Sequence, residues 1–347
     1  MAYTDIDKPS DYFNTVLYTG NGGTLTVSGV GFQSNFTWLK GRSFADYHVL
    51  TDSVRGVNSQ VYSNDVAVQG TQTNGITSFN SDGFVLGNWS NTNKASNTHV
   101  AWNWKAETSF TNDASGTGIG SIDSVGSFNN DAGFSIVSYT GTGSNGTIKH
   151  GLNSKPQVIF VKARTGDTNW GTYHEILGNT KFMRLNQTNA AETEATFWNS
   201  TTATSSVFSV GSNIVTNWNT KTMIAYCFAE KQGYSKFGSY TGNGNANGTF
   251  VYTGFKPAFV IQKASSAASY DWVMLDNKRD SFNVADESLY ANLSNAVQTS
   301  NHTDFLSNGF KLRSTAAGNN GSGTTYIYMA FASNPFVTST GVPATAR

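Results

Sequence analysis

The sequence predicts an all-β protein of three tandem β-sandwich repeats with a jelly-roll-like strand pattern. The composition, a phrase that occurs three times and the strand patterns after each copy support this prediction. Aromatic residues make up 13% of the 347 residues, and there are 35 glycines. Aromatic and β-branched residues favour strands, and Gly, Asn and Ser favour the tight turns between strands. We therefore expect many short strands and few helices.

The repeated phrase is SYTGTGSNG at 138–146. It returns as SYTGNGNANG at 239–248 and, shortened, as LYTGNGG at 17–23. The G-x-G-x-x-G spacing in the middle copy resembles a phosphate-binding loop, but such a loop must open a helix, because the anion binds the free N–H groups at the helix N-terminus. A strand-like segment follows instead at 158–161. We therefore interpret the glycines as hairpin residues with positive φ angles.

Further landmarks follow each phrase in the same register. An apolar strand ending in lysine comes next, at Lys40, Lys162 and Lys263, and each copy closes with a second apolar strand, written HVAWNWK, MIAYCFA and YIYMAFA. Each copy holds roughly seven or eight strand candidates in about 100 residues, which is typical of a sandwich or jelly roll. A repeat of this length can bury its own core.

The landmarks divide the chain into five segments. These are repeat 1 with an N-terminal segment at 1–106, a linker or added hairpin at 107–133, repeat 2 at 134–232, repeat 3 at 233–333 and a C-terminal tail at 334–347. The tail lacks periodicity, so a strap across a neighbour and a disordered end both remain open. Repeats 2 and 3 are joined only by the tripeptide KQG, which predicts that they are stiffly placed.

Composition excludes several classes of function. The 22 Lys+Arg balance the 22 Asp+Glu, so nothing favours nucleic acid as a partner. The N-terminus has no basic and apolar signal segment, and no apolar run is long enough to span a membrane. We therefore expect neither export by a cleaved signal nor membrane insertion. Cys227 is the only cysteine and lies in an apolar strand, so we expect a buried, inert thiol.

No catalytic residue, metal site or cofactor is predicted. None of the five histidines has a ligand partner at metal-binding spacing, although a calcium ion held by backbone carbonyls stays open. Asp52/Arg55 and Asp276/Arg279 recur at equivalent places in repeats 1 and 3. An acid followed by an arginine is more often a surface or turn-fixing ion pair than a catalytic couple.

Tryptophans in polar surroundings are candidates for stacking on sugars. Trp170 and Trp272 are the two speculative glycan contacts, and three more stand in similar contexts, at Trp89, Trp198 and Trp218. The alternative is that each ring anchors a sandwich core, since tryptophan buries a large apolar area. We favour the core for any one of them.

Several long phrases carry a resemblance to a known family. They are MAYTDIDKPSDYFNTVLYTGNG at the start, then SYTGNG, VYTGFKPAFVIQK, DFLSNGFKLRST and TYIYMAFASNPF. These phrases resemble a repeat-built family of virion structural or tail-fibre-like proteins from tailed phages of marine bacteria, including cyanophages and pelagiphages. The resemblance covers essentially the whole chain. It implies a virion component that is assembled in the host cytoplasm and released by lysis, and it supplies no catalytic motif.

From this we expect a non-enzymatic, tail-associated virion protein that contributes to host attachment through multivalent binding. The expected partners are other virion proteins, further copies of the chain in a homo-oligomer, with a trimer favoured, and a host surface glycan or protein. A decoration protein on the capsid head is the alternative. A glycan-degrading tail protein is the third hypothesis, and it would need two carboxylates facing each other across a cleft.

Overall fold

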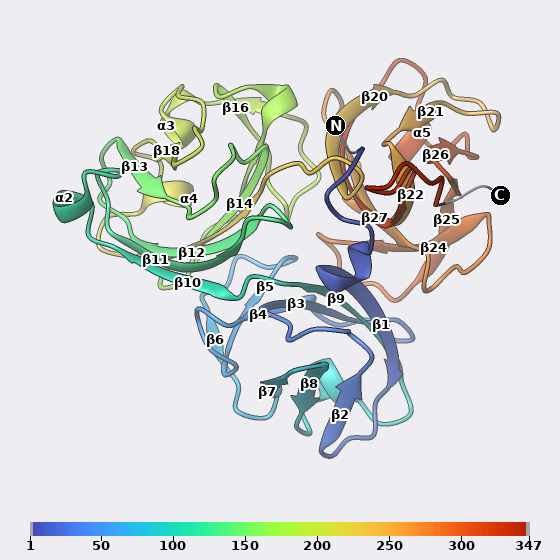
Figure 1. The fold of residues 1–347 in the computed structure, drawn as a ribbon, viewed down its shortest axis with the longest axis horizontal. Helices are drawn as coiled ribbons and strands as arrows, with labels where there is room; N and C mark the ends of the chain where they lie inside the picture. The colour runs from blue at the N-terminus through green and yellow to red at the C-terminus, as the bar shows by residue number, and fades with distance from the viewer. Residues whose placement is uncertain (1–2, 345–347) are drawn as a thin grey trace.

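The computed structural model describes residues 3–344 and consists almost entirely of β-structure, which confirms the all-β prediction. Within these residues no helix is longer than four residues. Figure 1 shows three lobes around a common centre: repeat 1 in blue, repeat 2 in green and repeat 3 in orange and red. Every hydrogen-bonded sheet draws its strands from one lobe only.

Repeat 1 has a large sheet in the order β1-β9-β3-β4-β5-β6 and a smaller one in the order β2-β8-β7. The two sheets enclose an apolar core that includes Val16, Leu39 and Phe84. The elements are η1 (Pro9–Asp11), β1 (Phe13–Thr19), β2 (Leu25–Ser28), β3 (Phe36–Gly41), β4 (Val49–Asp52), β5 (Ser59–Tyr62), β6 (Gly70–Thr71), β7 (Ile76–Asn80), β8 (Gly83–Leu86), α1 (Ser90–Asn93) and β9 (Thr98–Trp104).

Repeat 2 has the sheet β10-β11-β12-β19-β14-β15 and two small pairs, β13-β18 and β16-β17. Residues 107–133 contain β10 and β11, which pair with each other and extend the sheet from β12, so this segment is an added hairpin and not a free linker. The elements are β10 (Thr108–Asn112), α2 (Ala114–Thr117), β11 (Ser124–Asn129), β12 (Phe134–Thr140), β13 (Gly146–Lys149), β14 (Val158–Ala163), β15 (Gly171–His174), η2 (Glu175–Leu177), β16 (Lys181–Phe182), β17 (Glu192–Thr193), α3 (Ala195–Trp198), β18 (Val207–Val210), α4 (Ile214–Asn217) and β19 (Thr222–Phe228).

Repeat 3 joins its strands into one sheet of eight, in the order β20-β27-β22-β23-β24-β25-β26-β21. Its first four strands have the same order as β1-β9-β3-β4 and β12-β19-β14-β15, so the three repeats share a framework. The elements are β20 (Ser235–Thr241), β21 (Phe250–Tyr252), β22 (Phe255–Ala264), β23 (Val273–Asp276), β24 (Ala285–Tyr290), β25 (Gln298–Leu306), β26 (Gly309–Leu312), α5 (Ala317–Asn320) and β27 (Thr325–Pro335).

The repeated YTG phrase is a loop held by a buried asparagine. In repeat 2 the Tyr139 hydroxyl donates to the Thr216 carbonyl, and the Asn217 amide donates to the carbonyls of Ser144 and Gly211 at 2.6 and 2.7 Å. A Cβ on Gly141 would lie 2.2 Å from the Trp218 carbonyl oxygen, so only glycine fits there. The asparagines of the other repeats make matching bonds, at Asn93 and Asn320.

The tail forms a strap along the N-terminal segment. β27 continues to Pro335, and Ser339 then donates from its backbone N–H and its hydroxyl to the Asp7 carboxylate at 2.6 and 2.5 Å. Tyr3 donates its hydroxyl to the Gly254 carbonyl at 2.7 Å. The described part of the tail, 334–344, therefore matches the strap alternative, and residues 345–347 lie outside the described residues.

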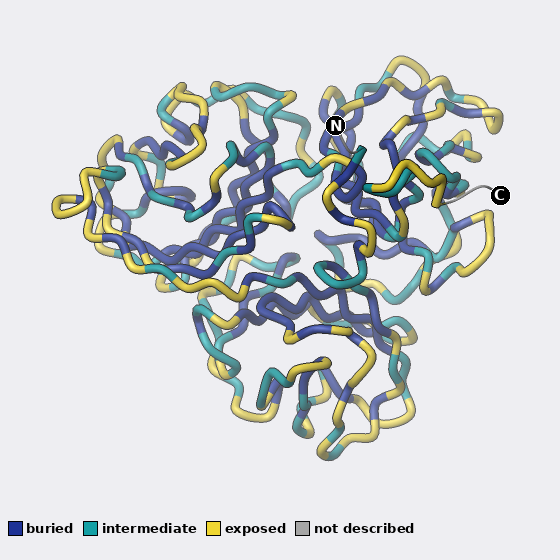
Figure 2. Tube along the Cα trace, viewed as in Figure 1, coloured by how far each residue is buried: buried dark blue, intermediate teal, exposed yellow. Residues whose placement is uncertain are grey.

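All three repeats contribute to one central core. The ring centroids of Phe13 and Phe331 lie 5.1 Å apart, those of Trp104 and Phe228 6.2 Å apart, and those of Phe36 and Tyr226 4.3 Å apart. Each of these contacts joins two different repeats. Figure 2 shows that the buried chain runs through the middle of the molecule while the outer loops are exposed. The lobes are therefore packed as one body by apolar burial.

Candidate functional site at the seams between the repeats

The landmark lysines lie where one repeat meets the next. The Lys162 ammonium donates to the Val66 carbonyl of repeat 1 at 2.9 Å, Lys263 donates to the Asn189 carbonyl of repeat 2 at 2.9 Å, and Lys40 donates to the Ser294 carbonyl of repeat 3 at 3.1 Å. We call these contacts seam 1–2, seam 2–3 and seam 3–1, and the residues the seam lysines. Because the third seam returns to repeat 1, the repeats form a closed ring.

The backbone repeats the same pattern at every seam. At seam 1–2 the Thr168 N–H donates to the Val66 carbonyl at 3.0 Å, and the Gln69 N–H donates to the Arg164 carbonyl at 2.9 Å. The matching bonds at the other seams are Ser269 N–H to Thr188, Ala191 N–H to Ser265, Asp46 N–H to Ser294 and Val297 N–H to Arg42. All three seams therefore have the same direction, as in a cyclic trimer with head-to-tail interfaces.

Burial shifts the titration of the seam lysines. Burial lowers the pKa of Lys162 to about 8, partly offset by Asp167 and Asp65. Burial likewise lowers the pKa of Lys40 and of Lys263 to about 8. Removing an ammonium from water disfavours its charge, and the carbonyl oxygens around it recover part of that cost.

The two candidate glycan contacts are seam residues. Trp170 is 0% and Trp272 is 2% exposed. The Trp170 indole N–H donates to the Tyr62 carbonyl of repeat 1 at 2.8 Å, and that of Trp272 donates to the Arg184 carbonyl of repeat 2 at 2.9 Å. Neither ring has a face free for a sugar, which corrects the suggestion of glycan stacking. The polar residues that precede each tryptophan lie in a loop that contacts the adjacent repeat, and the tryptophan ring itself is buried at the seam.

The two Asp/Arg pairs are also at seams, and they are fully buried. Arg55 donates to the Asp52 carboxylate at 2.5 Å, and the Tyr226 hydroxyl of repeat 2 donates to the same carboxylate at 2.7 Å. In the second pair, Asp276 accepts from the Trp102 indole of repeat 1 at 3.0 Å. Asp52 also accepts from two backbone N–H groups of its own turn. The pairs fix turns, as expected, but they do so in the interior and not on the surface.

Repeat 2 shows what replaces the pair at seam 2–3. His174 occupies the place of Asp52, because each pairs with the first residue of the preceding strand, Val158 in β14 and Phe36 in β3. Met329 of repeat 3 stands where Tyr226 stands at seam 1–2. A thioether cannot donate to a carboxylate, so a buried acid would lack a partner there. Burial lowers the pKa of His174 to about 4, which keeps its ring neutral.

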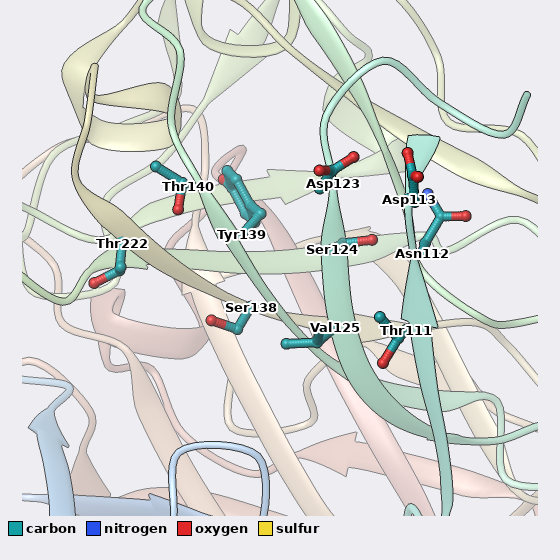
Figure 3. A pocket seen from close by; sticks show the side chains of 10 residues that line it. All are labelled: Thr111, Asn112, Asp113, Asp123, Ser124, Val125, Ser138, Tyr139, Thr140 and Thr222. Atoms are coloured by element: carbon teal, nitrogen blue, oxygen red, sulfur yellow. The ribbon is translucent and has the colours of Figure 1, made fainter. Parts of the chain in front are cut away.

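The hairpin of repeat 2 borders an open groove of about 300 Å³. Figure 3 shows Asp113 and Asp123 at the same end of the two hairpin strands. Asp113 caps α2 by accepting from the N–H groups of Ser115 and Gly116, and Asp123 accepts from the Ala114 N–H. Hydrogen bonds from Ser115 and Gly116 lower the pKa of Asp113, so this carboxylate stays ionised and is unsuited to act as a general acid.

Other candidate chemistry does not converge. Among residues 3–344, no group of three or more His, Cys, Asp or Glu side chains is placed to hold a metal ion. Burial raises the pKa of the Cys227 thiol, as expected for an inert residue. The described residues also contain no helix long and apolar enough to cross a membrane.

Fold and seams together define a class: an all-β, single-chain ring of three homologous domains joined head to tail. The chain belongs to the family described as "Domain of unknown function (DUF7483)", whose model matches residues 8–335. That match spans all three repeats. None of the curated proteins matches this chain.

Proposed function

We propose that the chain is a non-enzymatic structural protein of a bacteriophage virion, tail-associated and fibre-like, which contributes to attachment to the host surface. The closed ring of three equivalent β domains carries this proposal. Two kinds of side chain recur in all repeats: the seam lysines join the repeats into the ring, and the loop asparagines order a loop within each repeat. Exposed loops lie on the outer side of each lobe (Figure 2). This division suits a rigid platform that presents binding loops better than it suits a catalytic cleft.

The ring also supports multivalent binding. The buried seams hold the exposed outer edges, or rims, of the three repeats at fixed spacing. Weak binding sites on these rims can then reach one surface together, and after the first site binds, the effective concentration raises the affinity of the others. One chain already supplies a threefold arrangement, and a homotrimer would multiply the rims again. Its partners are other virion proteins and a glycan or protein on the host surface.

The second candidate is a decoration protein on the capsid head. The approximate threefold arrangement of the repeats favours it, because such a ring matches a seat at a threefold position of a symmetric shell. That role requires many copies per particle and an interface with the shell larger than about 1,000 Å². The attachment role requires few copies at one end of the particle.

Immunogold labelling of purified particles, with an antibody raised against this chain, separates the two candidates. Label at the tail or fibre tips is the expected result. Label spread over the head would replace attachment by decoration. Intact particles without label would contradict both.

A further inference from the structure

Seam 3–1 contains a cleft of about 340 Å³. Its walls come from the start of β1 in repeat 1 and from β22, β27 and the turn after β23 in repeat 3. The first and last domains of the chain therefore share it. In Figure 1 this is the seam between the blue and the orange-red lobes.

Two lysines give the cleft a positive charge that the protein does not neutralise. Lys256 is half-buried and Lys278 is exposed, and both line the cleft. Neither ammonium group makes an ion pair or a hydrogen bond with any described residue, and no described acidic residue lines the cleft. In a chain whose charges balance overall, this is a local excess that attracts an anion.

Two buried polar atoms of the cleft lack partners. Thr15 is only 3% exposed, and its hydroxyl makes no hydrogen bond within the described residues. The side-chain carbonyl oxygen of Asn277 is likewise buried and unbonded. Leaving a buried polar group unpaired is unfavourable, because its hydrogen bonds to water are lost and not replaced. A ligand with both an oxyanion and hydroxyl groups would satisfy the lysines and these two atoms together.

The other seams provide the comparison. When repeats 1 and 3 are aligned on their strands, Lys256 corresponds to Gln33, and Lys278, in the turn after β23, corresponds to Val54. Both residues of repeat 1 are uncharged. In repeat 2 they correspond to Lys155 and Ile176, and Lys155 forms an ion pair with Glu175. An unneutralised lysine pair is therefore specific to seam 3–1, although the three seams share one backbone framework. Ring closure by itself does not require these two charges.

We propose that this cleft binds the carboxylate or sulfate group of an acidic saccharide. The two lysines donate to the oxyanion, the Asn277 oxygen accepts from a sugar hydroxyl, and the Thr15 hydroxyl completes the contact. Uncharged polar groups of Asn14 and Ser333 line the remaining wall, which suits the other hydroxyls of a sugar. The assignment rests on the proposed attachment function, because it names the host-surface chemistry that the ring recognises.

Calorimetric titration of the full chain tests the site with three probes: glucuronate, glucose and inorganic sulfate. We expect saturable binding of glucuronate, at least tenfold weaker binding of glucose, and weakening of glucuronate binding when salt is raised. The double variant Lys256→Gln/Lys278→Gln should lose at least tenfold in affinity. Lys181→Gln is the matched control, because Lys181 is exposed, belongs to repeat 2 and does not line the cleft. This variant should bind glucuronate as the parent does.

Thr15→Val provides a second variant that preserves folding, since its hydroxyl bonds to nothing in the described protein. We expect several-fold weaker glucuronate binding with an unchanged or raised melting temperature. Equal binding by the parent and the double lysine variant, or no glucuronate binding, would overturn the proposal. Sulfate binding as tight as glucuronate binding would overturn its saccharide part. Glucuronate binding without virion label would leave this site standing and reject the virion function, and tail label without glucuronate binding would do the reverse.

Discussion

Arg55→Leu is the sharpest test of the seam interpretation. The change leaves the Asp52 carboxylate fully buried without its ion-pair partner. Removing one partner of a buried ion pair typically costs about 3–5 kcal/mol. Asp52 keeps the Tyr226 hydroxyl at 2.7 Å and two backbone N–H donors, so we expect a loss near the lower end, about 3 kcal/mol. The midpoint of urea unfolding, followed by tryptophan fluorescence, measures it.

Seam 2–3 supplies the matched rescue. The triple variant Asp52→His/Arg55→Leu/Tyr226→Met copies the set that repeats 2 and 3 use there, with no buried charge left. Its midpoint should return to within about 1 kcal/mol of the parent, because well-packed apolar replacements of buried ion pairs are often neutral. The midpoints are compared only between variants whose unfolding free energy depends on urea concentration with the same slope (m-value). A three-domain ring need not unfold in one step, and a changed slope would indicate a different transition. A single variant as stable as the parent, or a triple variant no better than the single, would refute the reasoning.

Three further predictions follow from the same structure. The pKa of Lys162 is about 8 in the folded state and 10.5 ordinarily, so between these pH values the unfolded chain binds more protons than the folded one. The melting temperature should therefore rise with pH across this window, and Lys162→Met should reduce the rise. Asn217→Ala removes four hydrogen bonds from the repeated loop and should lower stability by about 2–3 kcal/mol in urea unfolding. Gly141→Ala places a Cβ 2.2 Å from the Trp218 carbonyl oxygen and should lower the melting temperature, whereas Gly23→Ala, whose nearest neighbour atom is 3.8 Å away, should leave it nearly unchanged.

The sequence predicted the β-class and the register of the repeats because both depend on local patterns. The lysines, the tyrosine-glycine phrases and the closing strands all fall at equivalent places in the structure. The ring was missed because its contacts are made by backbone carbonyls of loops, such as that of Val66, which leave no signature in residue types. Trp170 is buried, as favoured, but its position at a seam was missed for the same reason, since its partner is a backbone oxygen of another repeat.

The cleft at seam 3–1 had a visible but unused signal. The aligned strands read GFQSNFTWLK, GLNSKPQVIFVK and GFKPAFVIQK, and Lys256 in the third has no acidic counterpart of the kind that Lys155 has in the second. Comparing charges between aligned repeats would have singled it out. What the alignment does not give is the partner surface, because Thr15 comes from the opposite end of the chain.

The seam between repeats 1 and 3, which no direct chain connection spans, carries additional side-chain contacts. Short connections hold repeat 1 to repeat 2 and repeat 2 to repeat 3, so those seams form at high effective concentration. Repeats 1 and 3 must meet through the whole length of the chain, at a higher entropic cost of closure. There Arg42 pairs with Glu287 at 2.8 Å, and the Asp7–Ser339 strap joins the two ends of the described chain. A ligand seated between Thr15 and Lys256 would add to the same closure, so binding at this cleft should also raise the melting temperature of the ring.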